Sequence, residues 1–287
     1  MTAPRPYTLV AELTYRCPLR CGWCANPESQ HPQPELALFA HNCITCGQFP
    51  EACPLGWGSH TQNGWTPDLR QKYGQRVEVC PTEAMREIGQ RRSAGEIMAQ
   101  VRRDAPFYED GGGMTLTGGE STMQPEMCLA LLRLAKADYL TTALETCGQT
   151  RWEVLAGLLP YLDDILYDLK HLDSEIHRAF TGLGNELILA NLRRLAAVGA
   201  PVTVRVPLIP GFNASVESVQ AIAEFVRSLD GPVKSVDLLP YHTLGQAKYK
   251  ALGRDYPWQA HDRLTDDEVA VLAGVVESYG LPVSIGG

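Results

Sequence analysis

Short apolar segments typical of buried strands alternate with segments of helical periodicity along most of this 287-residue chain. This alternation predicts repeated strand–helix–strand units and therefore an α/β fold with a parallel sheet. Strands are expected in the segments 7–13, 113–119, 141–146, 164–170, 202–210 and 235–241, with a further edge strand in 281–287. Helices are expected in 94–108, 125–137, 152–159, 185–198 and 215–229. Six main strands are too few to close an eight-stranded barrel, so an incomplete barrel is the expected architecture.

Polar residues follow the ends of the expected strands, at Gly118-Gly119-Glu120, Glu145-Thr146, Asp168, Arg205 and Tyr241-His242. The carboxyl ends of parallel strands build the active site of an α/β barrel, so these residues are expected around one mouth. Lys170 lies two residues after Asp168 and faces the same side of the strand, where the two side chains can pair. Arg205 lies among apolar residues, and a buried guanidinium requires an anionic partner.

Three of the nine cysteines, Cys17, Cys21 and Cys24, have the spacing C-x3-C-x2-C. A disulfide needs an even number of thiols and a closed zinc site needs four ligands, so this spacing indicates a metal centre with one open position. Thiolates are soft ligands that suit an iron–sulfur cluster or zinc. The alternative is a structural zinc site whose fourth ligand lies far away in the sequence.

Composition and charge narrow the range of functions. The net charge is −8 and both signs are scattered along the chain, which argues against a clustered basic surface for nucleic acid. No apolar run is long enough for a membrane-spanning helix, and residues 1–17 lack the pattern of a signal peptide. We therefore expect a cytoplasmic protein, in which the cysteines are better explained as metal ligands than as disulfides.

Helical periodicity fades between residues 31 and 90, where proline, glycine and polar residues dominate. A structureless loop of that length is improbable inside a compact domain, so this segment is expected to be an inserted module. It contains Cys43, Cys46, Cys53 and Cys80, which are candidate metal ligands. The expected organisation is the first strand and the first cysteine cluster in 1–30, the inserted module in 31–90, and the rest of the barrel in 91–287.

The motif CPLRCGWC at 17–24 is followed in order by NPES, GGGMTLTGGEST, LETCG, YDLKHLD, RVPLIPGFN and LLPYHTLGQAKYKALGR. This ordered set resembles the radical S-adenosylmethionine (SAM) superfamily and, within it, the glycyl radical enzyme activating enzymes similar to pyruvate formate-lyase activating enzyme. The resemblance implies a partial (β/α)6 barrel of TIM type in which Cys17, Cys21 and Cys24 bind a [4Fe–4S] cluster with one open iron. SAM would bind this iron and be cleaved reductively to a 5′-deoxyadenosyl radical, which abstracts a Cα hydrogen from a glycine of a partner glycyl radical enzyme.

The same resemblance implies contacts with SAM by Trp23, Gly118, Gly119, Glu120, Thr146, Asp168, Lys170, Arg205 and His242. Among these, Trp23 would lie beside the adenine, His242 near the ribose and Arg205 at the carboxylate. Lys170 would be catalytic together with the three cysteines. Glu145-Thr146 stands where the family often has Asp-Thr, a pair that helps to hold a monovalent cation in some members. The implied electron donor is flavodoxin or ferredoxin, and the implied state is a monomer.

Two segments depart from the family pattern. In some members the insert resembles a two-cluster ferredoxin, but only Cys43, Cys46, Cys53 and Cys80 remain here of eight ligands, which excludes two full auxiliary clusters. One auxiliary [4Fe–4S] cluster, a zinc site and no metal are the options left open. The segment LVAELTYRC stands where activating enzymes usually have DGPG and resembles radical enzymes that modify a peptide in pyrroloquinoline quinone biosynthesis, which is the alternative function. A non-catalytic electron carrier would leave the polar strand ends without a purpose.

Overall fold

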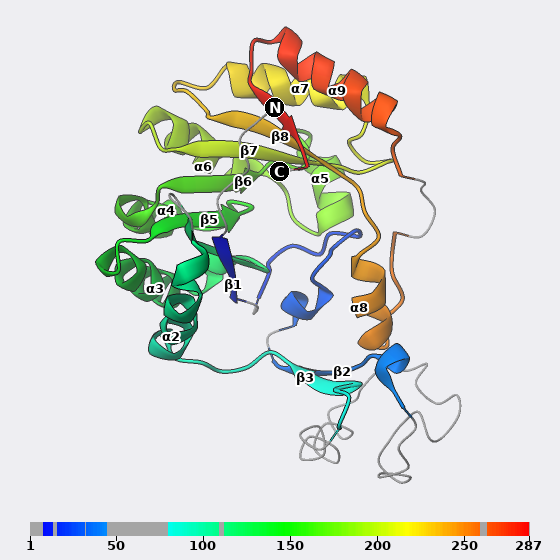
Figure 1. Ribbon diagram of the computed structural model, residues 1–287. Coiled ribbons are helices and arrows are strands. Elements are labelled where there is room, and N and C mark those ends of the chain that lie inside the picture. Colours follow the sequence, from blue (N-terminus) through cyan, green and yellow to red (C-terminus); the bar gives the residue numbers. More distant parts are fainter. Residues whose placement is uncertain are drawn as a thin grey trace.

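The computed structural model describes the backbone of residues 8–13 and all of residues 16–31, 33–44, 80–108, 112–258 and 263–286. One parallel sheet of seven strands dominates it, in the order β1-β4-β5-β6-β7-β8-β9. The strands are β1 (Thr8–Leu13), β4 (Gly113–Gly118), β5 (Thr141–Thr146), β6 (Asp164–Asp168), β7 (Val202–Leu208), β8 (Ser235–Pro240) and β9 (Val283–Ile285). β1 and β9 are the two edges of the sheet, so the barrel is open (Figure 1). The predicted α/β fold, its six main strands and its late edge strand are confirmed.

Most strands are joined by helices, as the alternating pattern predicts. The helices are α2 (Ala94–Asp104), α3 (Pro125–Ala137), α4 (Trp152–Leu158), α5 (Ser174–Thr181), α6 (Glu186–Ala197), α7 (Val216–Arg227), α8 (Gly245–Ala251) and α9 (Asp266–Ser278). α2 and α9 begin with capping boxes formed by Ser93 with Glu96 and by Thr265 with Glu268. In Figure 1, α2, α3 and α4 lie on one side of the sheet, whereas α8 lies on the opposite side, next to the segment that follows β1.

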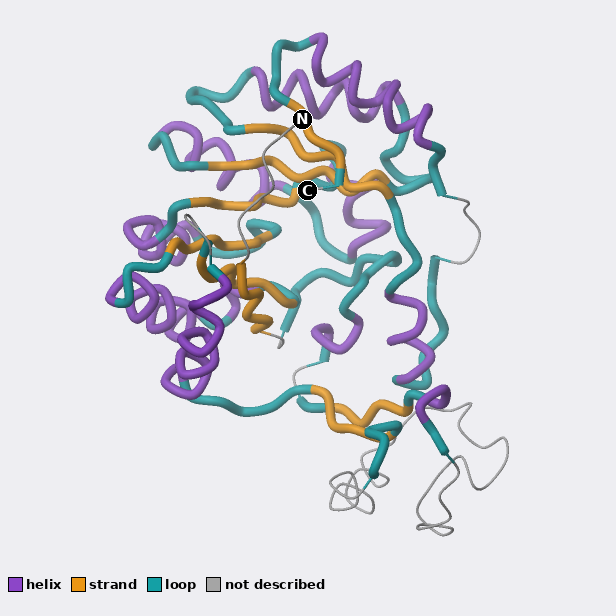
Figure 2. The backbone as a smooth tube through the Cα atoms, viewed as in Figure 1, coloured by secondary structure: helices purple, strands orange, loops and turns teal. Residues whose placement is uncertain are grey.

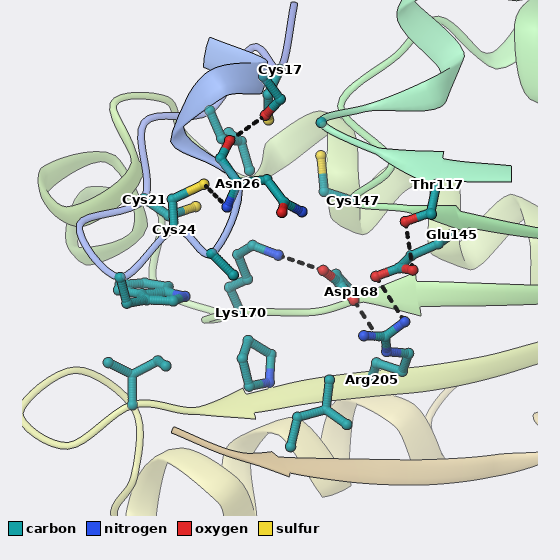
Figure 3. A pocket seen from close by; sticks show the side chains of 18 of the residues that line it. Cys17, Cys21, Cys24, Asn26, Thr117, Glu145, Cys147, Asp168, Lys170 and Arg205 are labelled. Carbon is teal, nitrogen blue, oxygen red and sulfur yellow. Dashed lines mark hydrogen bonds and ion pairs between the residues drawn. The ribbon is translucent and has the colours of Figure 1, made fainter. Parts of the chain in front are cut away.

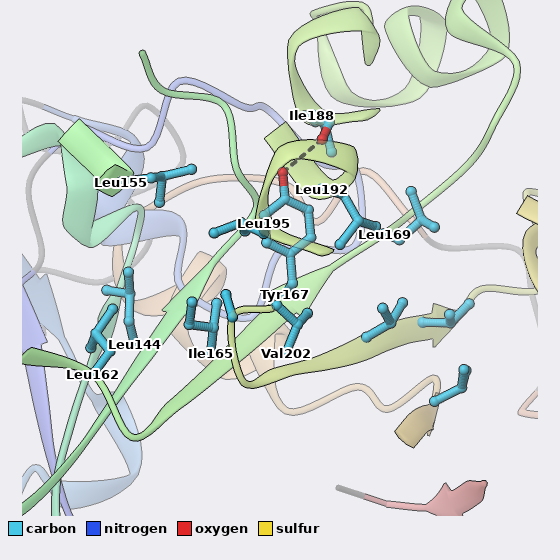
Figure 4. Packing of buried hydrophobic residues seen from close by; sticks show 14 of the residues in the cluster. Leu144, Leu155, Leu162, Ile165, Tyr167, Leu169, Ile188, Leu192, Leu195 and Val202 are labelled. Carbon is cyan, nitrogen blue, oxygen red and sulfur yellow. Dashed lines mark hydrogen bonds between the residues drawn. The ribbon is translucent and has the colours of Figure 1, made fainter. Parts of the chain in front are cut away.

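The hydrophobic core lies between the sheet and its covering helices. Leu144 of β5 and Ile165 and Tyr167 of β6 are completely buried, and they pack in one cluster with Leu155 of α4 and Leu192 of α6 (Figure 4). The hydroxyl of Tyr167 donates a 2.7 Å hydrogen bond to the carbonyl of Ile188, which satisfies its one polar atom. Burial of each large side chain contributes roughly 1.5–3 kcal/mol. This packing holds the carboxyl ends of β5 and β6 in fixed positions.

A second, smaller sheet lies apart from the main one (Figure 2). β2 (Glu35–Leu38) and β3 (Met85–Ile88) are antiparallel, with Leu38 opposite Met85, so the two ends of the stretch between them lie side by side. This arrangement suits a module that leaves and re-enters the fold at one place, and its boundaries at 31 and 90 stay a prediction. Cys46 and Cys53 lie outside the described residues. Within the described ranges, no helix has the length and apolar character needed to cross a bilayer.

Candidate functional site

A cavity of about 210 Å³ opens at the carboxyl ends of β4 to β8. Its wall is formed by residues 17–29 on one side and by the strand ends on the other (Figure 3). The site residues proposed from sequence that line it are Cys17, Cys21, Trp23, Cys24, Gly118, Gly119, Thr146, Asp168, Lys170, Arg205 and His242. The structure therefore brings together residues that lie far apart in the sequence, from Cys17 to His242.

Contacts with distant segments hold the loop that carries the three cysteines. The N–H of Cys17 donates to the carbonyl of Ser29 at 2.9 Å, and the N–H of Arg20 donates to the carbonyl of Thr181 at 2.7 Å. Gly119 approaches so closely that a Cβ there would lie 2.8 Å from the Cβ of Ser29 and 3.1 Å from that of Cys17. Only glycine fits this position without a shift, so the end of β4 and the cysteine loop form one continuous wall.

Burial raises the pKa of all three loop thiols, Cys17, Cys21 and Cys24, and the pKa reaches about 11 for Cys17 and about 12 for Cys21. The metal-free thiols are therefore protonated at neutral pH, and a metal would displace their protons on binding. Three soft donors around one cavity fit an iron–sulfur cluster that leaves one iron for another ligand. In the part of the chain that the structure describes, no three His, Cys, Asp or Glu side chains form a preformed metal site. The conclusion that these residues suit an iron–sulfur cluster therefore depends on the chemistry of the three cysteine thiols.

Charged side chains form a compact network at the strand ends (Figure 3). Lys170 Nζ lies 2.8 Å from Asp168 Oδ2, and Arg205 Nε lies 3.6 Å from Asp168 Oδ1. Arg205 Nη1 lies 2.9 Å from Glu145 Oε1. Burial acts to raise the pKa of Asp168, but Lys170 and Arg205 outweigh it and hold this pKa below its ordinary value. Two carboxylates thus face two cations, and the network carries no net charge.

Both carboxylate oxygens of Glu145 already have partners. Oε1 pairs with Arg205, and Oε2 accepts a 2.7 Å hydrogen bond from the hydroxyl of Thr117. Arg205, for which the SAM carboxylate was the expected partner, is thus already paired with protein carboxylates. A monovalent cation at Glu145 would have to approach a guanidinium of the same sign at close range, which is unfavourable. These residues do not fit the cation that some family members hold at this position.

The side chain of Glu120, a predicted SAM contact, is not part of the cavity wall. It is 1% exposed, and its carboxylate accepts hydrogen bonds from the hydroxyl of Thr146 and the N–H of Cys147, both at 2.7 Å. It also accepts from the N–H and the hydroxyl of Thr122. Glu120 therefore joins the end of β4 to the end of β5, and the hydroxyl of Thr146 is one of the donors that make this connection.

Aromatic rings form another part of the site. Trp23 packs on Phe212 with ring centroids 4.6 Å apart and meets Trp258 edge-on at 5.6 Å. Phe180 contacts both of these partners, at 5.0 and 5.5 Å. His242 is exposed at the cavity, and its Nδ1 accepts a 3.4 Å hydrogen bond from the N–H of Leu244. Of the rings in this group, Trp23 and His242 line the cavity, whereas Phe212, Phe180 and Trp258 pack against Trp23 or against one another. The ring of Trp23 suits contact with a flat heteroaromatic group.

Among the lining residues that sequence reasoning did not select are Cys147, Thr117 and Asn26. Cys147 and Thr117 lie at the ends of expected strands, so the rule that selected Thr146 also applies to them. Asn26 is different, because the residue that holds it is Lys248 of α8, 222 positions later. No local pattern marks that contact.

Two of the insert cysteines can be placed. Cys43 follows the short helix η2 (Ala40–Asn42), and Cys80 precedes β3. Burial acts to raise the pKa of Cys80, but hydrogen bonds from backbone N–H groups of Met85, Thr82 and Ala84 outweigh it and lower this pKa. A thiolate surrounded by N–H groups is well suited to bind metal. The metal centre predicted for this module stays a prediction.

Comparison with known proteins identifies the family. The model of the radical SAM superfamily matches residues 11–226. The chain is 38% identical to the choline trimethylamine-lyase activating enzyme of Oleidesulfovibrio alaskensis, over 94% of this chain and 89% of the relative. It is 41% identical to the isethionate sulfite-lyase activating enzyme of Nitratidesulfovibrio vulgaris, over 84% of this chain and 81% of the relative. The benzylsuccinate synthase activating enzyme of Thauera aromatica is 33% identical, over 94% of this chain and 85% of the relative.

Solved structures agree with this result. A domain of pyruvate-formate lyase-activating enzyme from Bacteroides vulgatus has a TM-score of 0.53 and 31% identity, covering 62% of this chain and 100% of that one. SuiB of Streptococcus suis bound to its precursor peptide SuiA has a TM-score of 0.62 but 14% identity, covering 98% and 49%, which shows a shared fold alone. The relatives named above therefore do not favour the peptide-modifying alternative. The chain belongs to the radical SAM superfamily, whose members use a [4Fe–4S] cluster and SAM, and within it to the activating enzymes of glycyl radical enzymes.

Proposed function

We propose that Cys17, Cys21 and Cys24 hold the [4Fe–4S] cluster of this activating enzyme and that SAM binds in the adjoining cavity. The observation that carries the proposal is that three thiols and a set of charged strand ends surround one cavity. When bound, the cluster and SAM supply an electron and a 5′-deoxyadenosyl radical, which takes a Cα hydrogen from a glycine of the partner glycyl radical enzyme. The residues of this chain bind these groups, orient them and exclude water.

The charged network would bind the methionine end of SAM, which carries both signs of charge. Asp168 and Glu145 would attract its amino and sulfonium groups, while Arg205 and Lys170 would attract its carboxylate, each giving up part of its present pairing within the network. These side chains are 9 to 30% exposed, so their attraction is less screened than on an open surface. Gly118 and Gly119 also line the cavity. Trp23, held in place by Phe212 and Trp258, would cover the adenine, and His242 would lie near the ribose.

Lys170 has a second role in this proposal. The carboxylate of Asp168 outweighs desolvation and raises the pKa of Lys170, so its ammonium group stays charged. The same positive charge acts to lower the pKa of Cys21. Lys170 would therefore stabilise negative charge on the cluster ligands and keep Asp168 oriented towards the cavity.

We also propose that Cys43, Cys46, Cys53 and Cys80 hold one metal centre in the inserted module, as a single auxiliary [4Fe–4S] cluster. The lowered pKa of Cys80 supports a thiolate ligand there. Zinc is the competing occupant, since four thiolates suit both. Thiolate ligands and a reduced cluster favour a reducing compartment, so we propose the cytoplasm as the location. Flavodoxin or ferredoxin is the proposed electron donor, and the proposed oligomeric state is a monomer.

Anaerobic reconstitution followed by reduction with SAM tests the proposal. The unmodified protein is expected to form 5′-deoxyadenosine, and Cys24→Ala is expected to lose it because one cluster ligand is missing. Cys128→Ser is the matched control, because Cys128 is buried in α3 and does not line the cavity. Its thiol donates a hydrogen bond to the carbonyl of Ser121. Iron analysis tests the auxiliary cluster: about eight irons per chain are expected with it and about four without it. A loaded cluster that yields no 5′-deoxyadenosine in the unmodified protein would contradict the proposal.

A further inference from the structure

α8 holds the loop that follows the third cysteine. Lys248 Nζ lies 2.6 Å from Asn26 Oδ1 and 2.7 Å from Glu28 Oε1. The side chain of Glu28 is only 6% exposed, so this ion pair is largely shielded from water. Gly245, at the start of α8, packs so closely that a Cβ there would lie 2.6 Å from the carbonyl oxygen of Cys24. The helix therefore contacts both the backbone of the third cysteine and the side chains that follow it.

Asn26 lies at the centre of these contacts. Its backbone N–H donates a 3.4 Å hydrogen bond to the sulfur of Cys24 (Figure 3), and its side-chain amide donates at 3.5 Å to the carbonyl of Gly118. Its carbonyl accepts hydrogen bonds from both the N–H and the hydroxyl of Ser29. Asn26 thus joins Cys24, the end of β4 and α8, and Lys248 anchors its side chain.

We propose that Lys248 is a positioning residue for the cluster, which keeps the Asn26 N–H directed at the sulfur of Cys24. The inference rests on the proposed function, because it requires a cluster on Cys24. Hydrogen bonds to cluster sulfurs stabilise the added electron and are one of the means by which a protein sets the reduction potential. Without Lys248, the side chain of Asn26 keeps only its 3.5 Å contact with the carbonyl of Gly118, so the N–H···S bond is expected to weaken and the cluster to become harder to reduce.

Lys248→Met tests this, because methionine has a similar length and no charge. The experiment uses the full-length, anaerobically reconstituted protein, with the reduced fraction of the cluster measured by EPR at a fixed solution potential. We expect iron content equal to that of the unmodified protein and a ratio of reduced to oxidised cluster that falls by up to tenfold, or about 59 mV for a one-electron couple. Lys250→Met is the matched control, since Lys250 is exposed on the same helix, and no change is expected there.

A double-mutant cycle with Asn26→Ala separates positioning from a direct effect of the lysine charge. If Lys248 acts through Asn26, each single variant lowers the potential and the double variant lowers it no further. Additive shifts would overturn the proposal, because Lys248 would then act on the cluster by itself. An unchanged potential in Lys248→Met would overturn it as well.

Lys248→Arg covers the case in which Lys248→Met does not hold a cluster. The planar guanidinium keeps the charge but is larger and presents its donors in a different geometry, so the contact with Asn26 Oδ1 is expected to change. A lower potential is expected, and a potential equal to that of the unmodified protein would overturn the inference. Failure of the unmodified protein to assemble a cluster would overturn the proposed function together with this inference. A normal cluster whose potential is insensitive to Lys248 overturns the inference alone.

Discussion

At the carboxyl end of β5, the side chain of Glu145 reaches across to β7, where its Oε1 lies 2.9 Å from Arg205. An aspartate would be one methylene shorter and would retract the carboxylate from the guanidinium. Because Arg205 also faces Asp168 at 3.6 Å, it occupies the space between two carboxylates that would otherwise attract a positive ion. With the longer Glu145, the positive charge between the two carboxylates is the guanidinium of Arg205. With a shorter aspartate, we expect room for a cation from solution at this point.

The length of Glu145 leads to a prediction about salts. SAM binding by the unmodified protein is expected to be equal in sodium, potassium and tetramethylammonium chloride at one ionic strength. Glu145→Asp opens room for an ion, and its binding is expected to be about tenfold weaker in tetramethylammonium than in potassium, roughly 1.4 kcal/mol. Equilibrium dialysis of SAM with the reconstituted proteins measures both. A clear requirement of the unmodified protein for potassium or sodium would refute the assignment.

At the scale of elements, the end of β4 and the cysteine loop act as one unit because Gly119 lets them touch. A Cβ at Gly119 would lie 2.8 Å from the Cβ of Ser29, closer than side-chain atoms approach one another. The loop is also tied to α5 and α8, through the N–H of Arg20 and through Lys248. A shift of any one of these elements therefore changes the position of the thiols.

Gly119→Ala tests this contact directly. The added methyl group is expected to push the loop outwards at a cost of about 1–3 kcal/mol and to lower the iron retained after reconstitution by at least half. Gly157→Ala is the control, because Gly157 lies in α4 with nothing within 4 Å of the added atom. That variant is expected to keep its iron and to gain about 0.5–1 kcal/mol of stability. Equal iron in the two variants would show that the loop tolerates the contact.

Elements with strong local patterns could be predicted from the sequence. The helix 125–137 has the same bounds as α3. Asp168 and Lys170 form the expected ion pair, although β6 ends at Asp168, two residues earlier than predicted, so Lys170 lies in the segment after the strand. The hairpin β2–β3 could not be predicted, because each strand has four residues and the two are separated by more than forty. The partners of Arg205 and the anchor of Asn26 depend on how whole elements pack, which no short segment encodes.

At the scale of the whole molecule, one buried histidine links stability to pH. His177 of α5 is 1% exposed, and its Nδ1 lies 2.6 Å from the carbonyl of Leu183, while its Nε2 is buried without a partner. Burial lowers the pKa of His177 below the ordinary value of 6.5. The folded protein therefore resists protonation of His177, whereas the unfolded chain accepts a proton near pH 6.5.

It follows that the contribution of His177 to the free energy of unfolding is complete above the unfolded pKa and falls as the pH decreases below it. The slope is at most about 1.4 kcal/mol per pH unit. His177→Asn keeps an N–H for the carbonyl of Leu183 and removes the titrating group. The difference in free energy of unfolding between the unmodified protein and this variant is therefore expected to shrink as the pH is lowered from about 7 to about 5. Urea unfolding of the metal-free proteins measures this difference. A difference that is constant across this range would contradict the assignment.

The contacts of α8 also have a consequence for how the protein is made. Lys248 and Arg254 reach back 222 and 227 residues to Asn26 and Pro27. At about 5–20 residues per second, the ribosome needs roughly 10–45 s to synthesise that stretch after the cysteine motif. During this time the three thiols have been translated, but the helix that shapes their loop has not. Delivery of iron and sulfide is therefore expected to follow release of the nascent chain, and the cell has to shield the emerging thiols from oxidation and from other metals until then.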